Sequence, residues 1–286
     1  MKTSLSYLPQ LKQDQILHVV EIIKSVANPQ KIILFGSYAT NKYVEDTYIE
    51  DGTRYEYISD YDFLIVSSRD EEKEFILKSK IVDRTRSLFK TPVNPIIHSI
   101  EYINEGLEIG QYFFTDIVKE GILLYDTKET NFAKARALSK EEQVQIATRH
   151  FDQWYASGKA LLNSSNFNLK ENELKLSIFE LHQACECFYN AVLLVFTAYK
   201  PKTHNLDILR QYAKPLSKEL FTIFPFPNDN EFENHLFDVL KRSYIEARYK
   251  NDYIVNIEEL IILQDRISKM KNIIERICDS HINQIK

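Results

Sequence analysis

The distribution of apolar residues changes character once along this chain, close to Asp126. Before this point, short aliphatic runs typical of β-strands alternate with segments whose apolar residues recur at helical spacing. After it, helical spacing continues and strand character is lost. Alternating strands and helices predict a compact unit built on a sheet, whereas helices alone predict a bundle. We therefore expect an α+β protein, with a small mixed-sheet domain at residues 1–126 and an all-α helical bundle at residues 127–286.

The first domain is predicted to interleave strands and helices. In chain order, we expect a helix over 9–26, strands over 32–35 and 57–66, a helix over 69–90, a strand over 92–100, a helical segment over 101–120 broken at 106–110, and a strand over 121–126. Pro92 and Pro95 favour a sheet edge or a strand start at these positions, because proline cannot donate to a central ladder. The acidic, tyrosine-rich stretch 41–59 is predicted to be an inserted hairpin or loop. It could cover a site or contact a partner, or it could be an ordinary solvated surface.

The second domain is predicted to consist of helices. The segment 127–166 shows helical spacing, and further amphipathic segments follow at 171–200, 203–214, 228–249 and 256–284. Short polar or proline-bearing turns separate them.

Two polar motifs stand at the ends of apolar strands in the first domain. Gly36 and Ser37 end the strand "KIILF", and Asp60 and Asp62 open the strand in "SDYDFLIV". Strand side chains alternate between faces, so both aspartates are expected on the same side. Neighbouring carboxylates favour a hard divalent cation such as Mg²⁺ between them. Gly36 allows a ligand to approach the backbone, and Ser37 can offer its hydroxyl and amide to a phosphate. Together the motifs predict a site for Mg²⁺ and a nucleoside triphosphate such as ATP.

In this order and spacing, the motifs resemble the minimal nucleotidyltransferase domain of the polymerase β superfamily, over roughly residues 30–125. The resemblance implies that Gly36 and Ser37 hold the triphosphate. It also implies that Asp60 and Asp62 carry the Mg²⁺ ions that activate the attacking hydroxyl and stabilise the leaving pyrophosphate. The family usually supplies a third carboxylate from the next strand. Here that strand has none, and Asn94 and His98 are the polar side chains in its middle.

The helical half carries a second resemblance, to the HEPN domain, which is found together with minimal nucleotidyltransferases. It rests on a His-Gln-Ala-x-Glu helix segment, a Lys-Thr-His-x-Leu turn and a later Arg-Tyr pair, at His182, Gln183, Ala184, Glu186, Lys202, Thr203, His204, Leu206, Arg248 and Tyr249. Lys202, His204 and Arg248 are candidates for a basic pocket that binds a nucleotide phosphate. His204 could instead be a neighbour of a helix N-cap, and His182 is expected to be a hydrogen-bonded core histidine.

Many HEPN ribonucleases use an arginine followed, four to six residues later, by a histidine. No histidine follows Arg242 or Arg248 at that spacing, and Arg149 and His150 are adjacent on another helix. RNA cleavage is therefore disfavoured.

These resemblances imply transfer of a nucleoside monophosphate to a hydroxyl on a protein tyrosine or a small molecule, in a toxin–antitoxin or defence context. The alternative is a nucleotide-binding module without catalysis, which the missing third carboxylate favours. The net charge of −5 argues against general nucleic-acid binding. No membrane-spanning run or signal sequence is visible, so we expect a cytoplasmic protein, with a homodimer as an open possibility.

Overall fold

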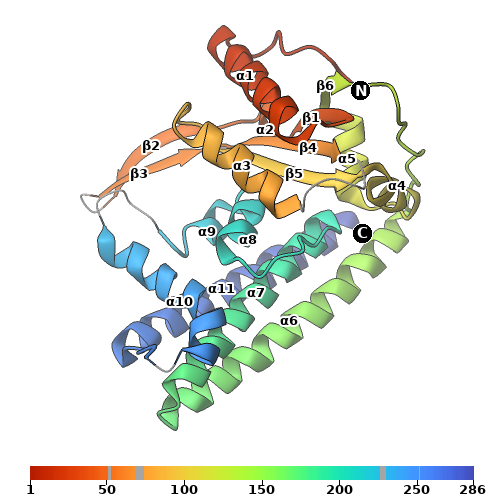
Figure 1. Cartoon of the computed structure of the whole chain (residues 1–286). Coiled ribbons are helices and arrows are strands. Elements are labelled where there is room, and N and C mark those ends of the chain that lie inside the picture. Colours follow the sequence, from red (N-terminus) through yellow and green to blue (C-terminus); the bar gives the residue numbers. More distant parts are fainter. Residues whose placement is uncertain (51–52, 68–73, 226–229, 251) are drawn as a thin grey trace. The chain divides into compact units, whose positions relative to one another are not determined.

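The computed structural model describes residues 1–50, 53–67, 74–225, 230–250 and 252–286 (Figure 1). The chain divides into two compact units. Residues Met1–Tyr48 and Glu56–Ala137 form the first, which carries the main sheet. Residues Leu138–Lys286 form the second together with Ile49–Tyr55, and this unit carries the long helices.

The first unit is organised around a mixed sheet of four strands in the order β5-β4-β1-β6. β1 (Lys31–Phe35) is antiparallel to both β4 (Tyr61–Ser67) and β6 (Ile122–Asp126), whereas β4 is parallel to β5 (Val93–Ser99). β5 lies at one edge, as its prolines predicted. The register pairs Asp62 with Phe35 on one side and with Asn94 on the other. These residues therefore form one row across three strands.

Both faces of the sheet are covered. On one face, Ile32, Leu34 and Phe63 pack in a core with α1 (Gln10–Ala27) and α3 (Glu74–Arg86). On the other, Ile33 and Leu64 are fully buried as well. Strands buried on both faces read as continuous aliphatic runs, which explains why β1 and β4 were visible in the sequence.

The predicted strand over 57–66 is wrong in its bounds, because two strands lie there. β2 (Glu45–Glu50) and β3 (Thr53–Ile58) pair as a separate two-stranded sheet, so the insertion is a hairpin. At its base, the Val44 amide donates to the Ser59 hydroxyl at 2.8 Å, and the Ser59 amide donates to the Val44 carbonyl at 2.9 Å. This closed base ends β3 before Asp60, and β4 starts at Tyr61.

The helical segment after β5 is broken at the C-terminal end of the predicted range 106–110. α4 (Ile100–Glu108) continues through Gly106, and α5 (Tyr112–Glu120) follows. A Cβ on Gly106 would lie 2.5 Å from Cδ2 of Phe114, so this glycine allows α5 to pack closely. The break falls at Gly110, which has a φ of +77°.

Residues 127–139 are not helical, which corrects the predicted start of the helical half. The Asn104 side chain donates to the Asn131 carbonyl at 3.2 Å and accepts from the Ala133 amide at 2.7 Å, and the Arg136 amide donates to the Leu107 carbonyl. These bonds hold the segment against α4. The units divide after Ala137, C-terminal to the predicted boundary at Asp126.

The second unit is a bundle of helices, as Figure 1 shows. Its helices are α6 (Lys140–Lys170), α7 (Leu174–Thr197), α8 (Leu206–Ala213), α9 (Lys218–Phe221), α10 (Glu231–Tyr249) and α11 (Ile257–Ile285). α6 starts at a capping box in which Ser139 and Glu142 bond each other's backbone amides. α7 is apolar on most of its circumference and forms the centre of the core.

Candidate functional site

Gly36 and Asp62 touch at the ends of two neighbouring strands. Gly36 follows β1 directly, and its φ of +74° lies in the left-handed region that favours glycine. A Cβ built on Gly36 would lie 2.4 Å from Oδ2 and 3.2 Å from Cγ of Asp62. The backbone thus passes the carboxylate at a distance that only glycine permits.

Ser37 lies next to this contact, on the one-turn helix α2 (Gly36–Ala39) that begins where a simple turn was expected. Its carbonyl accepts from the Lys42 amide at 2.8 Å, while the Thr40 hydroxyl donates to the Gly36 carbonyl at 3.0 Å. Tyr38 is fully buried and anchors this turn in the core. The two residues expected to meet a phosphate are therefore held on a rigid connection.

The two aspartates have different surroundings. Asp62 lies on β4 in contact with Gly36, whereas Asp60 precedes β4 and is 8% exposed. Burial of a carboxylate is costly unless hydrogen bonds or a cation stabilise its charge. Asp60 and Asp62 are thus candidates for holding a cation where β4 begins.

Asn94 occupies the strand position from which a third carboxylate was expected. It pairs in register with Asp62, and its Nδ2 donates to Oδ1 of Asp62 at 2.9 Å. Sequence reasoning missed Lys78 on α3, whose Nζ donates to Oδ1 of Asn94 at 3.4 Å. Burial lowers the pKa of Lys78 to about 8, while the nearby Asp62 carboxylate favours its charged form. His98, the other polar residue of β5, contacts Glu74 instead, at 3.4 Å.

The oxygen donors of this site fit Mg²⁺ when the ion arrives with a nucleotide. Among the residues that the structure describes, no group of three or more His, Cys, Asp or Glu side chains could hold a metal. Mg²⁺ commonly uses one or two protein carboxylates, and completes its shell with water and substrate phosphates. Asp60 and Asp62 would be those carboxylates.

In the second unit, two of the three predicted basic residues meet on one aromatic ring. His204 stacks on Tyr244 with ring centroids 4.9 Å apart, and the Arg248 guanidinium lies 4.5 Å from the centroid of the same ring. Arg248 also lies over Phe179, at 4.9 Å. Lys202 is exposed on the loop before His204. Sequence reasoning missed Tyr244, because a tyrosine on an amphipathic helix does not by itself indicate a functional site.

This cluster is less basic than expected, because an acid lies inside it. The buried Glu186 carboxylate is 3.0 Å from Nδ1 of His204. His204 precedes the N-cap of α8, Asn205, whose side chain accepts from the amides of Asp207 and Ile208. The prediction of an N-cap neighbour is therefore confirmed, and the pairing with Glu186 gives His204 a second structural role.

His182 is a hydrogen-bonded core histidine, as predicted. It is 1% exposed, and its ring nitrogens lie 3.0 Å from the Leu240 carbonyl and 3.2 Å from the His204 carbonyl. Burial lowers the pKa of His182, although the carbonyls and Glu186 act in the opposite direction.

One arginine–histidine pair with the ribonuclease spacing was missed. His281 follows Arg276 after four residues on α11. Arg276 is paired with Glu219, whereas His281 stacks on Phe196 with ring centroids 4.1 Å apart. Residues five apart on an α-helix point about 140° away from each other. The pair thus has the spacing of the motif, but its members contact different neighbours.

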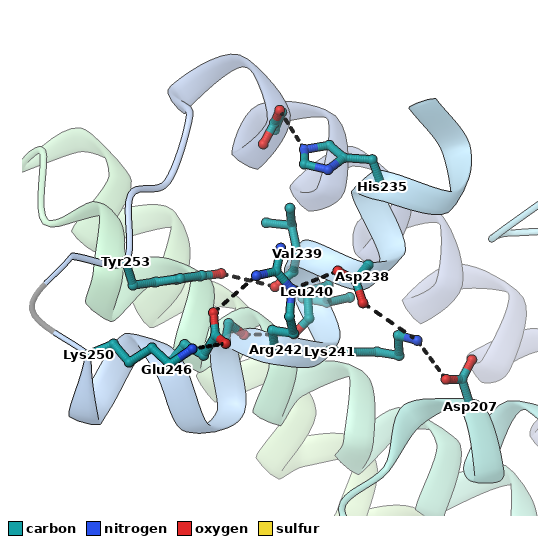
Figure 2. Close-up of polar contacts among 12 residues, drawn as sticks. Asp207, His235, Asp238, Val239, Leu240, Lys241, Arg242, Glu246, Lys250 and Tyr253 are labelled. Atoms are coloured by element: carbon teal, nitrogen blue, oxygen red, sulfur yellow. Dashed lines mark hydrogen bonds and ion pairs between the residues drawn. The ribbon is translucent and has the colours of Figure 1, made fainter. Parts of the chain in front are cut away.

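A surface cavity of about 600 Å³ lies between α8 and α10. Figure 2 shows a series of ion pairs at this position. Lys241 is 2.7 Å from Asp207 and 3.9 Å from Asp238, and Arg242 forms ion pairs with both Asp238 and Glu246. Each drawn charge faces an opposite one, and surface pairs of this kind contribute little to stability. Lys202, His204 and Arg248 are not among the residues that line this cavity.

In the described part of the chain, no helix has the length and apolar character needed to cross a membrane. No curated protein matches the sequence. The family model described as the HEPN domain matches residues 151–281, from within α6 to near the end of α11. This span contains the Lys-Thr-His-x-Leu turn on which the resemblance rested. The helical half of the chain therefore contains a HEPN domain.

Proposed function

We propose that the sheet-bearing unit is a Mg²⁺-dependent nucleotidyltransferase that moves a nucleoside monophosphate from a nucleoside triphosphate to a hydroxyl. The observation that carries this proposal is the contact between Gly36 and the Asp62 carboxylate at adjacent strand ends. A close backbone approach beside strand-borne carboxylates is what a metal-bound triphosphate requires.

In this proposal, Gly36 and Ser37 position the triphosphate, and Asp60 and Asp62 hold Mg²⁺. The acceptor hydroxyl releases its proton to solvent water, and its oxygen forms a bond to the α-phosphorus. The bond from that phosphorus to the bridging oxygen breaks, and pyrophosphate leaves with the electron pair. Mg²⁺, when bound, supplies electrostatic stabilisation of the phosphate oxygens. The acceptor is a protein tyrosine or a small molecule, and the HEPN domain supports a toxin–antitoxin or defence context.

The test is incorporation of labelled nucleotide from ATP and the other nucleoside triphosphates, with and without Mg²⁺. We expect Mg²⁺-dependent labelling that Asp62→Asn abolishes and that Asp83→Asn, an exposed aspartate on α3, leaves unchanged. Labelling that survives Asp62→Asn would place the reaction elsewhere and overturn the proposal.

The second candidate is nucleotide binding without transfer, and Asn94 favours it. An amide in the place of a third carboxylate lowers the affinity of the site for metal ions. Tight Mg²⁺-dependent ATP binding, with no labelling of any acceptor, would favour this candidate over transfer.

We also propose that Lys202, His204 and Arg248 form a secondary nucleotide-binding surface on the HEPN domain. The guanidinium and imidazole that share the Tyr244 ring support it. The spacing of Arg276 and His281 favours a ribonuclease as a further role of this domain. RNA loss that His281→Gln abolishes and Arg248→Ala does not would assign cleavage to α11.

A further inference from the structure

Lys78, Asn94 and Asp62 form a hydrogen-bonded chain from α3 to the centre of the sheet. Lys78 donates to Oδ1 of Asn94 at 3.4 Å, and Nδ2 of Asn94 donates to Oδ1 of Asp62 at 2.9 Å. A lysine has only donors and an ionised carboxylate has only acceptors. The two neighbours therefore fix the orientation of the amide between them.

This orientation makes Asn94 a poor metal ligand. Its oxygen faces the ammonium of Lys78 and its NH₂ faces Asp62. To turn the oxygen toward a cation held by Asp62, the amide would have to flip and lose both hydrogen bonds. One oxygen of Asp62 is also engaged by the amide, which leaves fewer lone pairs for metal ions.

The charges of the site also favour a smaller number of bound metal ions. Of these three described side chains, Asp60 and Asp62 carry two negative charges, and Lys78, joined to Asp62 through Asn94, adds one positive charge. One divalent cation then brings the three side chains together to a net charge of +1. With a third carboxylate and no lysine, the same site would carry three negative charges and could hold two such ions.

We propose that the Lys78 ammonium, joined to Asp62 through Asn94, supplies a positive charge in the place of one divalent cation, so that this site takes a single Mg²⁺ with its nucleotide. The inference rests on the proposed function, and it makes Lys78 and Asn94 the residues that set the number of metal ions. Lysine is a compact point charge with three N–H donors, so it can balance part of the negative charge here without occupying a metal-ligand position.

The test counts metal ions directly. Mn²⁺ takes the same oxygen ligands as Mg²⁺ and can be titrated by electron paramagnetic resonance in the presence of a non-hydrolysable ATP analogue. We expect one nucleotide-dependent Mn²⁺ per wild-type chain and two per chain in the Lys78→Met/Asn94→Asp double variant. Lys78→Arg, which keeps the charge, and Lys80→Met, on the same helix, should each stay at one.

Two ions in the wild type would overturn this inference and leave the nucleotidyltransferase proposal standing. No nucleotide-dependent ion in the wild type would overturn both. Circular dichroism verifies that the double variant is folded, and the Asn94→Asp single variant gives an independent measurement if it is not. With Lys78 retained, that variant should still bind one ion, and two would contradict the role of Lys78.

Discussion

Substitution of Gly36 by alanine tests the contact on which the proposed nucleotide site depends. A non-glycine residue at a φ of +74° costs about 1–2 kcal/mol. The new Cβ would also lie 2.4 Å from Oδ2 of Asp62, and forced repacking of this kind costs about 1–3 kcal/mol. Together these effects predict a loss of about 2–5 kcal/mol in the sheet-bearing unit, with the Asp62 carboxylate displaced.

Gly110 supplies the matched control. It has a similar φ of +77°, so Gly110→Ala carries a similar backbone cost without the contact to Asp62. Because the single tryptophan, Trp154, lies in the helical unit, stability is best followed by hydrogen exchange of the β1 and β4 amides. Displacement of Asp62 should remove one charge-assisted contact to the bound Mg–ATP, which costs about 1.5–3 kcal/mol of binding free energy. We therefore expect Gly36→Ala to weaken Mg–ATP binding by about 10- to 150-fold in calorimetry. Equal stability and equal ATP affinity in the two variants would refute the reasoning.

Three further predictions concern the packing around the sites. Ser139→Ala removes the cap of α6 and should lower the free energy of unfolding by about 1 kcal/mol, measured by urea unfolding followed through Trp154 fluorescence. Ser157 is exposed in the middle of α6, so Ser157→Ala should change this free energy little. Equal effects of the two substitutions would contradict the capping role. The buried Lys31 ammonium, 2.5 Å from Asp126, holds the pKa of that carboxyl below its ordinary 3.8. This stabilisation is present above pH 3.8 and is lost as the pH falls through the lower pKa of the folded state. The melting temperature of Asp126→Asn should therefore lie below that of the wild type at pH 7 and approach it near pH 2. A difference in melting temperature that does not depend on pH would contradict the pairing. Gly158→Ala places a Cβ 2.6 Å from Cε1 of Phe188. The overpacking cost of about 1–3 kcal/mol should exceed the gain of about 1 kcal/mol in helix propensity, so we expect a lower melting temperature. A higher melting temperature would show that the Phe188 ring moves aside.

Features set by local sequence were predictable. The aliphatic runs of β1 and β4 marked the centre of the sheet, and the prolines of β5 marked its edge. The turn around His204 marked the HEPN domain, because its residues are adjacent in the chain. In each case the signal and the structure occupy the same few residues.

Features set by distant contacts were not predictable in the same way. The spacing of 127–139 is helical, but hydrogen bonds to Asn104 hold part of the segment in an extended path. The role of Lys78 appears only once α3 lies against β5 and the register places Asn94 beside Asp62. Arg276 and His281 matched a known spacing but were overlooked on a long helix without turn signals.

The most direct test of this account is a crystal structure of the whole chain with Mg²⁺ and a non-hydrolysable nucleoside triphosphate. The account predicts the phosphates against Gly36 and Ser37, with a metal ion on Asp60 and Asp62. A triphosphate bound elsewhere, with Asp62 in contact with neither phosphate nor metal, would contradict it.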